Sequence, residues 1–458
     1  MTVPDAIREL VAGWLPGQRW FAGKGRDHVL TVERLAELAP SPQVTLWVAH
    51  IDYGDGETEL YQLPLVARAE AVEALEHVLL GTVDTGGGLR WVYDALHDKD
   101  ATPAWPLGMQ ADATVGPVRL RRLAESADIP VDEASLVLSG EQSNTSLVYG
   151  DLAIMKLFRR LQPGINPDIE VQSALSRLGA KHVARLLGTA EIDLDGTPTS
   201  LAFLQEFMTS ATDGWGLATA SVRDLMAEAD LHAEEAGGDF AGEAERLGEA
   251  VAAVHADLAA AFGARQAQPG FLQARADAMH ERLAAALEIV PALAEVAPGL
   301  RAVYDALPTA SGDVALQRIH GDLHLGQTLR TVTRWVLIDF EGEPMAPMEQ
   351  RREFDSTLRD VAGMLRSFEY AGHHRVIEAA FDQQLGYRAA EWAERNRGAF
   401  LDGYAAAAGH DPREQDLLLR AYEADKAVYE AVYEARNRPA WLAIPLTSLT
   451  RLVSGARS

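Results

Sequence analysis

Cysteine is absent from this 458-residue sequence. Disulfide bonds, thiolate metal sites and a cysteine nucleophile are therefore excluded, and nothing in the composition calls for an oxidising compartment. Long apolar runs are absent too, and the first residues show no basic stretch followed by an apolar segment. We therefore expect a cytoplasmic protein without a membrane anchor.

Basic residues are scarce. The chain has 41 Lys and Arg against 67 Asp and Glu, which gives a formal net charge of −26 at pH 7. Such a surface repels the phosphate backbone of nucleic acids and the head groups of anionic membranes, so we expect neither as a partner. A neutral substrate is indifferent to this field, whereas ATP needs local positive charge and Mg²⁺ to overcome it.

Strands and helices are predicted in separate parts of the chain. Val44–Arg68 reads as a hairpin around a Gly-Asp-Gly turn, and residues 135–208 read as a strand-rich segment with one helix, which begins at Asn166-Pro167 and ends before Gly179. A stretch with two prolines, residues 98–108, separates the two parts.

Beyond Gly216 the apolar spacing becomes helical. The clearest helices are predicted over Phe240–Phe262, Ala276–Val290, Phe354–Tyr370 and Glu414–Arg436. We also expect one short strand pair, around His320 and over Trp335–Phe340. Because strands and helices do not alternate, a doubly wound sheet is disfavoured and an α+β fold is predicted. Its domains are expected at residues 1–100, 101–208 and 209–458.

The strongest chemical signal is HGDLHLGQ, from His320 to Gln327, followed twelve residues later by Asp339. Phosphoryl transfer needs a carboxylate that orients the attacking hydroxyl and separate oxygen ligands that hold Mg²⁺. Asp322 fits the first role, and Gln327 and Asp339 fit the second. The spacing matches the protein-kinase catalytic loop, with Gln in place of its Asn and Gly321 in place of its Arg. The alternative is that these aspartates only cap turns.

Upstream residues complete the pattern of a kinase. Lys156 lies in an apolar strand, where an ammonium needs a partner, and Glu170 on the next helix is the predicted one. A lysine at the edge of a strand is the alternative. Candidate phosphate contacts stand in a polar hairpin turn before that strand, and candidate contacts to adenine follow a later strand: Gln142, Ser143, Asn144 and Thr145, then Gln205, Glu206, Phe207 and Met208.

Several segments together resemble bacterial maltokinases, and the resemblance covers nearly the whole chain. The segments that carry it are QRWFAGK (Gln18–Lys24), SGEQSNTS (Ser139–Ser146), HGDLHLGQTLR (His320–Arg330), DFEGEP (Asp339–Pro344), RDVAGMLRSFEY (Arg359–Tyr370) and the final helix, Tyr422–Trp441.

The resemblance implies a bilobal, protein-kinase-like fold with an added N-terminal cap. It implies transfer of the γ-phosphoryl group of ATP to the anomeric hydroxyl of maltose, which gives maltose 1-phosphate for α-glucan (glycogen) synthesis. Related kinases phosphorylate glucosamine or aminoglycosides, and a non-catalytic kinase-like binding module is a further alternative. Whether the chain forms a complex with a trehalose-processing enzyme stays open.

The acceptor site is predicted between the catalytic loop and the final helix. Tyr422, Lys426, Tyr429 and Tyr433 form one stripe of that helix, in which aromatic faces and polar groups suit a sugar. A packing face rich in tyrosine is the alternative. The full set of candidate sugar contacts is His324, Glu341, Tyr422, Lys426, Tyr429, Glu430 and Tyr433.

Overall fold

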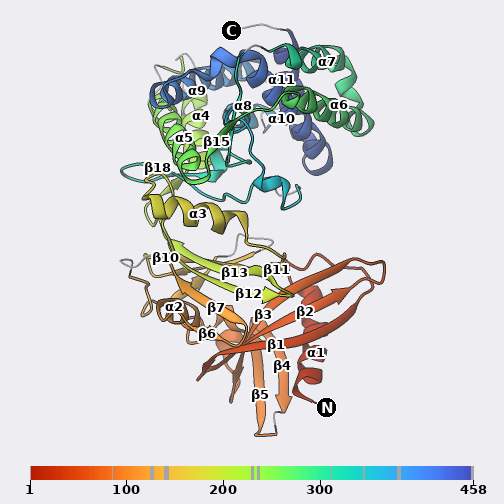
Figure 1. Ribbon diagram of the computed structural model, residues 1–458, viewed down its shortest axis with the longest axis vertical. Coiled ribbons are helices and arrows are strands. Elements are labelled where there is room, and N and C mark those ends of the chain that lie inside the picture. Colours follow the sequence, from red (N-terminus) through yellow and green to blue (C-terminus); the bar gives the residue numbers. More distant parts are fainter. Residues whose placement is uncertain are drawn as a thin grey trace. The chain divides into compact units, whose positions relative to one another are not determined.

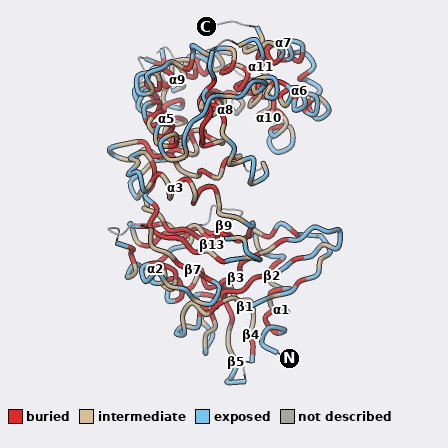
Figure 2. Tube along the Cα trace, viewed as in Figure 1, coloured by how far each residue is buried: buried red, intermediate tan, exposed pale blue. Residues whose placement is uncertain are grey.

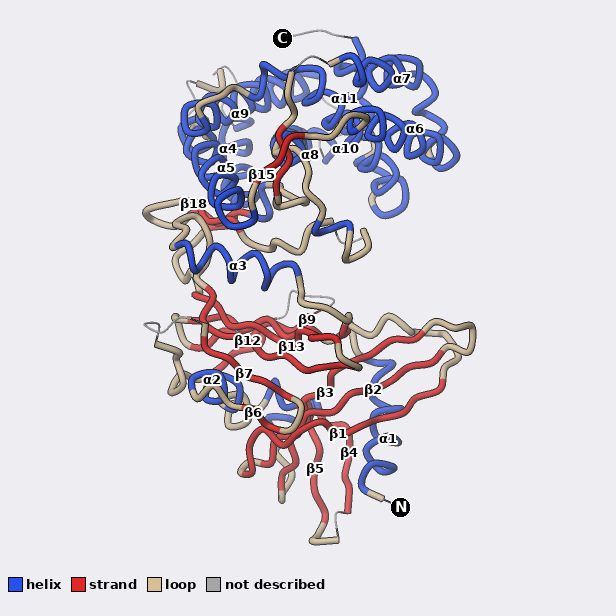
Figure 3. The backbone as a smooth tube through the Cα atoms, viewed as in Figure 1, coloured by secondary structure: helices blue, strands red, loops and turns tan. Residues whose placement is uncertain are grey.

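The computed structural model describes residues 2–84, 86–123, 128–138, 144–227, 232–234, 238–310, 312–343, 346–378 and 383–454. Two units emerge from its internal contacts. Unit 1 comprises Met1–Arg177 and Ala184–Thr209, and unit 2 comprises Leu178–Val183 and Ser210–Ser458. Strands concentrate in unit 1 and helices in unit 2 (Figures 1 and 3). The predicted segregation of strands and helices is confirmed.

The first sheet of unit 1 is antiparallel. Its order is β1 (Val29–Pro40), β2 (Gln43–Asp52), β3 (Thr58–Arg68), β5 (Leu89–Asp94) and β4 (Leu79–Asp84), with β11 (Arg160–Leu161) paired to β3. The predicted hairpin is the pair β2 and β3. Because successive side chains of a strand point to opposite faces, Trp47 and Ala49 of β2 meet α1 (Val3–Trp14) in one cluster, while Leu46 and Val48 join another.

The second sheet of unit 1 has seven strands. Its order is β6 (Thr114–Val115), β7 (Val118–Arg122), β12 (Leu186–Leu194), β13 (Thr197–Glu206), β10 (Ala153–Phe158), β9 (Asn144–Tyr149) and β8 (Ser135–Val137). The helices of this part are α2 (Ala104–Gln110) and α3 (Pro167–Leu178), the latter where Asn166-Pro167 and Gly179 predict it.

The two sheets of unit 1 share one hydrophobic core, to which β2 contributes Val48 and β10 contributes Met155. The buried stretches of both sheets are visible in Figure 2. Polar contacts also join the sheets: the Gln62 amide of β3 donates to the Leu201 carbonyl at 2.6 Å, and buried Arg159 donates to Asp94 at the end of β5, also at 2.6 Å. The N-terminal sheet is therefore an integral part of unit 1.

Unit 2 is built mainly from helices. They are α4 (Gly214–Ala227), α5 (Ala241–Phe262), α6 (Phe271–Ile289), α7 (Ala297–Ala306), α8 (Leu358–Glu378), α9 (Gln383–Ala408), α10 (Asp416–Asn437) and α11 (Ala443–Ser454). Helices α5 and α9 pack closely, because Gly403 of α9 leaves room for the Glu245 carbonyl of α5. A side chain at Gly403 would collide with that backbone, so the crossing depends on this glycine.

The short strands of unit 2 differ in part from the prediction. Strand β18 (Trp335–Leu337) lies where a strand is expected, but it pairs with β17 (Thr328–Arg330), which in turn pairs with β14 (Thr212–Asp213). The expected strand around His320 is wrong: β16 (Ala315–Gln317) pairs with β15 (Ala264–Gln266) and ends before it. The chain leaves strand geometry there because the His320 and Gly321 amides bond a side chain of α8.

Within the described residues, no helix combines the length and the apolar character needed to cross a membrane.

Candidate active site

The loop His320–Gln327 is held in place by a buried aspartate of α8. The Asp360 carboxylate accepts hydrogen bonds from the backbone N–H of His320 at 2.7 Å and of Gly321 at 2.8 Å. It also contacts His255 Nε2 of α5 at 3.1 Å. Burial raises the pKa of Asp360, but the hydrogen bond and charge of His255 outweigh it and hold that pKa below its ordinary value. This network fixes the backbone on which Asp322 stands.

Helix α8 also approaches the loop closely. A Cβ placed on Gly363 would come within 2.6 Å of the Leu323 carbonyl oxygen, so this position requires a residue without a side chain. No sequence pattern predicts a role for Asp360, Gly363 or His255. Asp360 and Gly363 lie in the RDVAGM stretch, which carries part of the family resemblance but no local chemical signal.

Asp322 forms a charged cluster with residues of α10 and of the segment after Asp339. The Lys426 ammonium lies 3.0 Å from Asp322 Oδ1 and 3.2 Å from Glu343 Oε2. Tyr429 hydrogen-bonds Glu343, and its ring centre lies 5.0 Å from the ammonium. Burial lowers the pKa of Lys426, but the negative charges of Asp322 and Glu343 outweigh it and raise that pKa above its usual value. The lysine is thus a permanent cation beside the predicted catalytic carboxylate.

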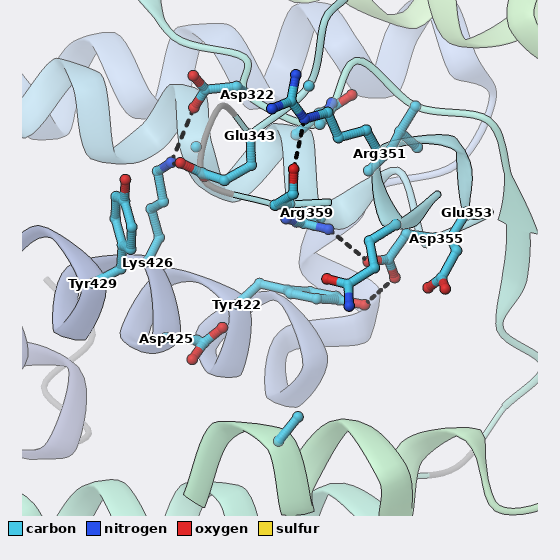
Figure 4. A pocket seen from close by; sticks show the side chains of 18 of the residues that line it. Asp322, Glu343, Arg351, Glu353, Asp355, Arg359, Tyr422, Asp425, Lys426 and Tyr429 are labelled. Atoms are coloured by element: carbon cyan, nitrogen blue, oxygen red, sulfur yellow. Dashed lines mark hydrogen bonds and ion pairs between the residues drawn. The ribbon is translucent and has the colours of Figure 1, made fainter. Parts of the chain in front are cut away.

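This cluster lines one side of a cavity of about 340 Å³ in unit 2 (Figure 4). Helices α6, α8 and α10, the catalytic loop, residues 342–343 and residues 346–355 contribute to its wall. Its charged lining residues are Asp322, Glu343, Glu353, Asp355, Asp360 and Asp425 on the acidic side, and Arg275, Arg282, Arg351, Arg359 and Lys426 on the basic side. Six carboxylates thus face five cations, and the wall is nearly neutral although the whole chain is strongly acidic.

Most of these carboxylates have a cationic partner in the same wall. Asp355 is contacted by Arg275 at 3.1 Å and by Arg359 at 3.3 Å, and it accepts a hydrogen bond from the Tyr422 hydroxyl at 2.7 Å. Asp425 accepts a hydrogen bond from Arg282 Nε at 2.7 Å. Carboxylates compensated in this way carry little net attraction for a further cation.

Gln327 and Asp339 lie side by side beyond the cluster. The Gln327 amide donates to Asp339 Oδ2 at 3.3 Å, and the Ile338 N–H donates to the Gln327 carbonyl at 3.0 Å. Asp339 has a φ of 65°, in the left-handed region that residues other than glycine rarely adopt. A carboxylate and an amide in contact are oxygen donors of the kind that Mg²⁺ prefers, so this pair fits the metal role predicted for it.

The other predicted sugar contacts lie outside the cavity lining. Glu430 of α10 forms a salt bridge with buried Arg366 of α8 at 2.7 Å, and burial raises its pKa. Tyr433 is 44% exposed and lies under the Arg438 guanidinium. His324 accepts a hydrogen bond from the Gly326 N–H at 3.0 Å, and burial lowers its pKa.

Glu341, also a predicted sugar contact, is partly buried and is absent from the lining. Of the seven predicted contacts, the cavity brings together Tyr422, Lys426 and Tyr429, and it adds Glu343, Arg282 and Asp425. Of these three added residues, only Glu343 was indicated by a sequence pattern, through its place after Asp339.

Unit 1 carries the predicted nucleotide contacts. Lys156 Nζ of β10 lies 4.0 Å from Asp168 Oδ2 in the first turn of α3, and Asp168 is almost fully buried. Glu170, the predicted partner, stands two residues later in the same turn. The ammonium of Lys156 is therefore held on the side of β10 that faces α3.

The predicted phosphate contacts stand where β9 begins. Asn144 and Thr145 open this strand, and the Thr145 hydroxyl accepts a hydrogen bond from buried Arg159 at 2.8 Å. Gln142 and Ser143 lie outside the described residues.

The predicted adenine contacts end β13. Gln205 and Glu206 are its last residues, and the Phe207 N–H donates to the Leu152 carbonyl at 3.0 Å, while Met208 follows in a loop.

The sequence of this chain is similar to a known domain family and to known sugar kinases. Residues 14–98 match the family described as the maltokinase N-terminal cap domain. The glucosamine kinase of Streptacidiphilus jiangxiensis is 29% identical over 325 residues, which cover 68% of this chain and 72% of that protein. The glucosamine kinase of Mycolicibacterium smegmatis is 29% identical over 326 residues, 69% of this chain and 79% of that protein.

One solved structure, a glucosamine kinase in complex with glucosamine, ADP and inorganic phosphate, superimposes with a TM-score of 0.71 at 25% identity. The match covers 97% of this chain and 98% of that chain. The predicted α+β kinase-like fold is thereby confirmed. The predicted resemblance is confirmed to this extent: residues 14–98 match the maltokinase N-terminal cap domain, and the chain as a whole is similar to sugar kinases with a kinase-like fold.

Proposed function

We propose that the chain is an ATP-dependent kinase that phosphorylates the anomeric hydroxyl of maltose. The observation that carries the proposal is the Asp322, Lys426 and Glu343 cluster at the wall of a cavity whose charges are nearly balanced. A carboxylate fixed by a neighbouring ammonium is ready to accept the proton of an attacking hydroxyl. The similar proteins and the similar structure, which are named as glucosamine kinases, support a phosphotransferase that acts on a sugar.

The proposed step is an in-line transfer. The anomeric oxygen of the sugar attacks the γ-phosphorus of ATP, its proton passes to Asp322, and the bond from the γ-phosphorus to the bridging oxygen breaks to release ADP. Lys156 is proposed to contact the nucleotide phosphates. Gln327 and Asp339 would hold Mg²⁺, which neutralises phosphate charge when bound.

The cavity wall favours maltose over a polycation. An aminoglycoside needs several uncompensated carboxylates, but Asp355 and Asp425 already have arginine partners. Glu353 is the one exposed residue among the six acidic residues of the lining. A neutral sugar, by contrast, can hydrogen-bond the lone pairs and N–H groups that the ion pairs leave free.

The length of the cavity favours two sugar rings. From Tyr422 to Tyr429 the lining of α10 extends about 10 Å along the helix axis, and Arg275 to Arg282 of α6 extends as far. A six-membered ring with bonds of about 1.5 Å measures roughly 3 Å between opposite ring atoms, or about twice that with its hydroxyls. We propose that the first glucose ring lies at Asp322 and the second at the Arg282 and Asp425 pair.

The proposal is tested by incubating the protein with ATP and Mg²⁺ and, in parallel, with maltose, glucose, glucosamine and kanamycin. ADP release is followed by a coupled assay, and the phosphorylated product is identified by phosphorus NMR. We expect maltose to give the highest kcat/KM and a product phosphorylated at its anomeric oxygen. A product phosphorylated elsewhere, or a clear preference for kanamycin, would contradict the proposal.

A further inference from the structure

We propose that Lys426 is a specificity-determining residue that excludes amino sugars. Its ammonium occupies the pair of carboxylates, Asp322 and Glu343, that would otherwise hold a cationic group of the acceptor. The inference rests on the proposed function, since it assumes that a sugar is phosphorylated at its anomeric oxygen.

The geometry places an internal cation where a substrate cation would be attracted. Lys426 Nζ contacts one oxygen of Asp322 at 3.0 Å and one of Glu343 at 3.2 Å (Figure 4). The Lys426 side chain is 27% exposed, and the Tyr429 ring lies against its ammonium. One residue of α10 thereby contacts two acidic groups from different segments and offsets part of their negative charge.

The rest of the wall offers no substitute pair of uncompensated carboxylates among its described residues. Asp355 and Asp425 have arginine partners, and Asp360 is engaged by His255 and by two backbone amides of the catalytic loop. Glu353 is exposed. An ammonium on the acceptor would therefore depend on the cluster that Lys426 occupies.

The chemistry of the acceptor brings its second carbon close to this lysine. When the anomeric oxygen approaches Asp322, the substituent on the adjacent carbon lies next to the same cluster. A hydroxyl there hydrogen-bonds either a carboxylate or an ammonium, whereas an ammonium meets a like charge in a partly buried site. Specificity against the amino sugar would thus come from repulsion and not from a better contact with the neutral sugar.

The test uses glucose and glucosamine, which differ only in that substituent. We compare kcat/KM for both acceptors in the unmodified protein, in Lys426→Met and Lys426→Gln, and in Lys426→Arg as the matched control that keeps the charge. We expect both neutral variants to raise the ratio of glucosamine to glucose kcat/KM by at least tenfold, although each loses total activity. The arginine variant should keep the original ratio within about threefold.

Equal losses for both sugars in the neutral variants would overturn the inference, because a merely structural lysine would not distinguish them. Binding of the two sugars is also measured by calorimetry without nucleotide, at a pH where glucosamine is protonated. If the unmodified protein phosphorylates no sugar, the proposed function fails. If only the variants are inactive, the proposed function stands. In both cases the binding ratio decides the inference by itself: an increase of at least tenfold upon loss of the Lys426 charge supports it, and an unchanged ratio overturns it.

Discussion

Asp360→Ala should uncouple the catalytic loop from α8. The Asp360 side chain is inaccessible to solvent and accepts from the His320 and Gly321 amides, besides its contact with His255. Truncation leaves a buried N–H donor at His320 and a partly buried one at Gly321 without their acceptor, and it removes the carboxylate partner of the buried His255. Leaving a buried donor unsatisfied costs roughly 1–3 kcal/mol, and breaking a buried pair by removing one partner costs roughly 3–5 kcal/mol. Because these terms overlap, we expect a loss of about 3–5 kcal/mol in unfolding free energy.

The assay is urea unfolding of the variant, followed by far-UV circular dichroism and by tryptophan fluorescence, to which tryptophans of both units contribute. Asp305→Ala is the matched control, because Asp305 also contacts a histidine, His280, but is 71% exposed. The control should change stability by less than about 1 kcal/mol. If Asp360→Ala is equally mild, the loop is held by other contacts and our account of it is wrong.

The same aspartate predicts a dependence on pH. Since the pKa of Asp360 is lower in the folded protein than the ordinary value of 3.8, its stabilising contribution is complete above the unfolded-state pKa. It is lost as the pH falls from about 4 through the folded-state pKa. Asp360→Asn should remove this part of the acid sensitivity, so the stability difference from the unmodified protein should shrink between pH 5 and pH 3. A constant difference over that range would contradict the assignment.

Three further predictions concern catalysis. Asp322→Asn and Asp339→Asn should each lower kcat by about 10²-fold or more while the circular dichroism spectrum stays unchanged, because positioning and metal charge supply most of the rate in such transfers; retained turnover of Asp339→Asn at saturating Mg²⁺ would refute its metal role. Lys156→Ala should raise KM for ATP or lower kcat, and unchanged values of both would favour a lysine at the strand edge. Arg282→Met should raise KM for maltose about tenfold but leave KM for glucose nearly unchanged, and equal effects on the two sugars would place the second ring elsewhere.

The sequence predicted the elements whose signals are local. The hairpin of β2 and β3, the start of α3 at Asn166-Pro167 and the helical spacing of α5 and α10 all follow from turn residues, caps and apolar periodicity. The prediction of a strand at His320 was wrong because the apolar residues near it contain no sign of Asp360. This residue lies forty positions away and accepts hydrogen bonds from the backbone amides of the loop.

The candidate site was predictable only where chemistry and spacing coincide. Asp322 and Lys426 could be chosen from the motif and from the helical stripe, and the structure brings them into contact. Arg282 on α6 could not be found in this way, since its role depends on the packing of α6 against α10 and not on any local pattern. The helical stripe also predicted too long a contact surface. Tyr433 lies on the same face of α10 by its spacing, but it is one turn beyond the cavity lining.

The most direct test of the proposed activity is the identity of the phosphorylated product. The protein is incubated with ATP, Mg²⁺ and maltose, and the product is analysed by phosphorus NMR for coupling between phosphorus and the anomeric proton, with Asp322→Asn as the control for contaminating kinases. We predict maltose 1-phosphate from the unmodified protein and far less of it from the variant in the same time. A phosphate at any other position, or ATP turnover without a phosphorylated sugar, would contradict the account.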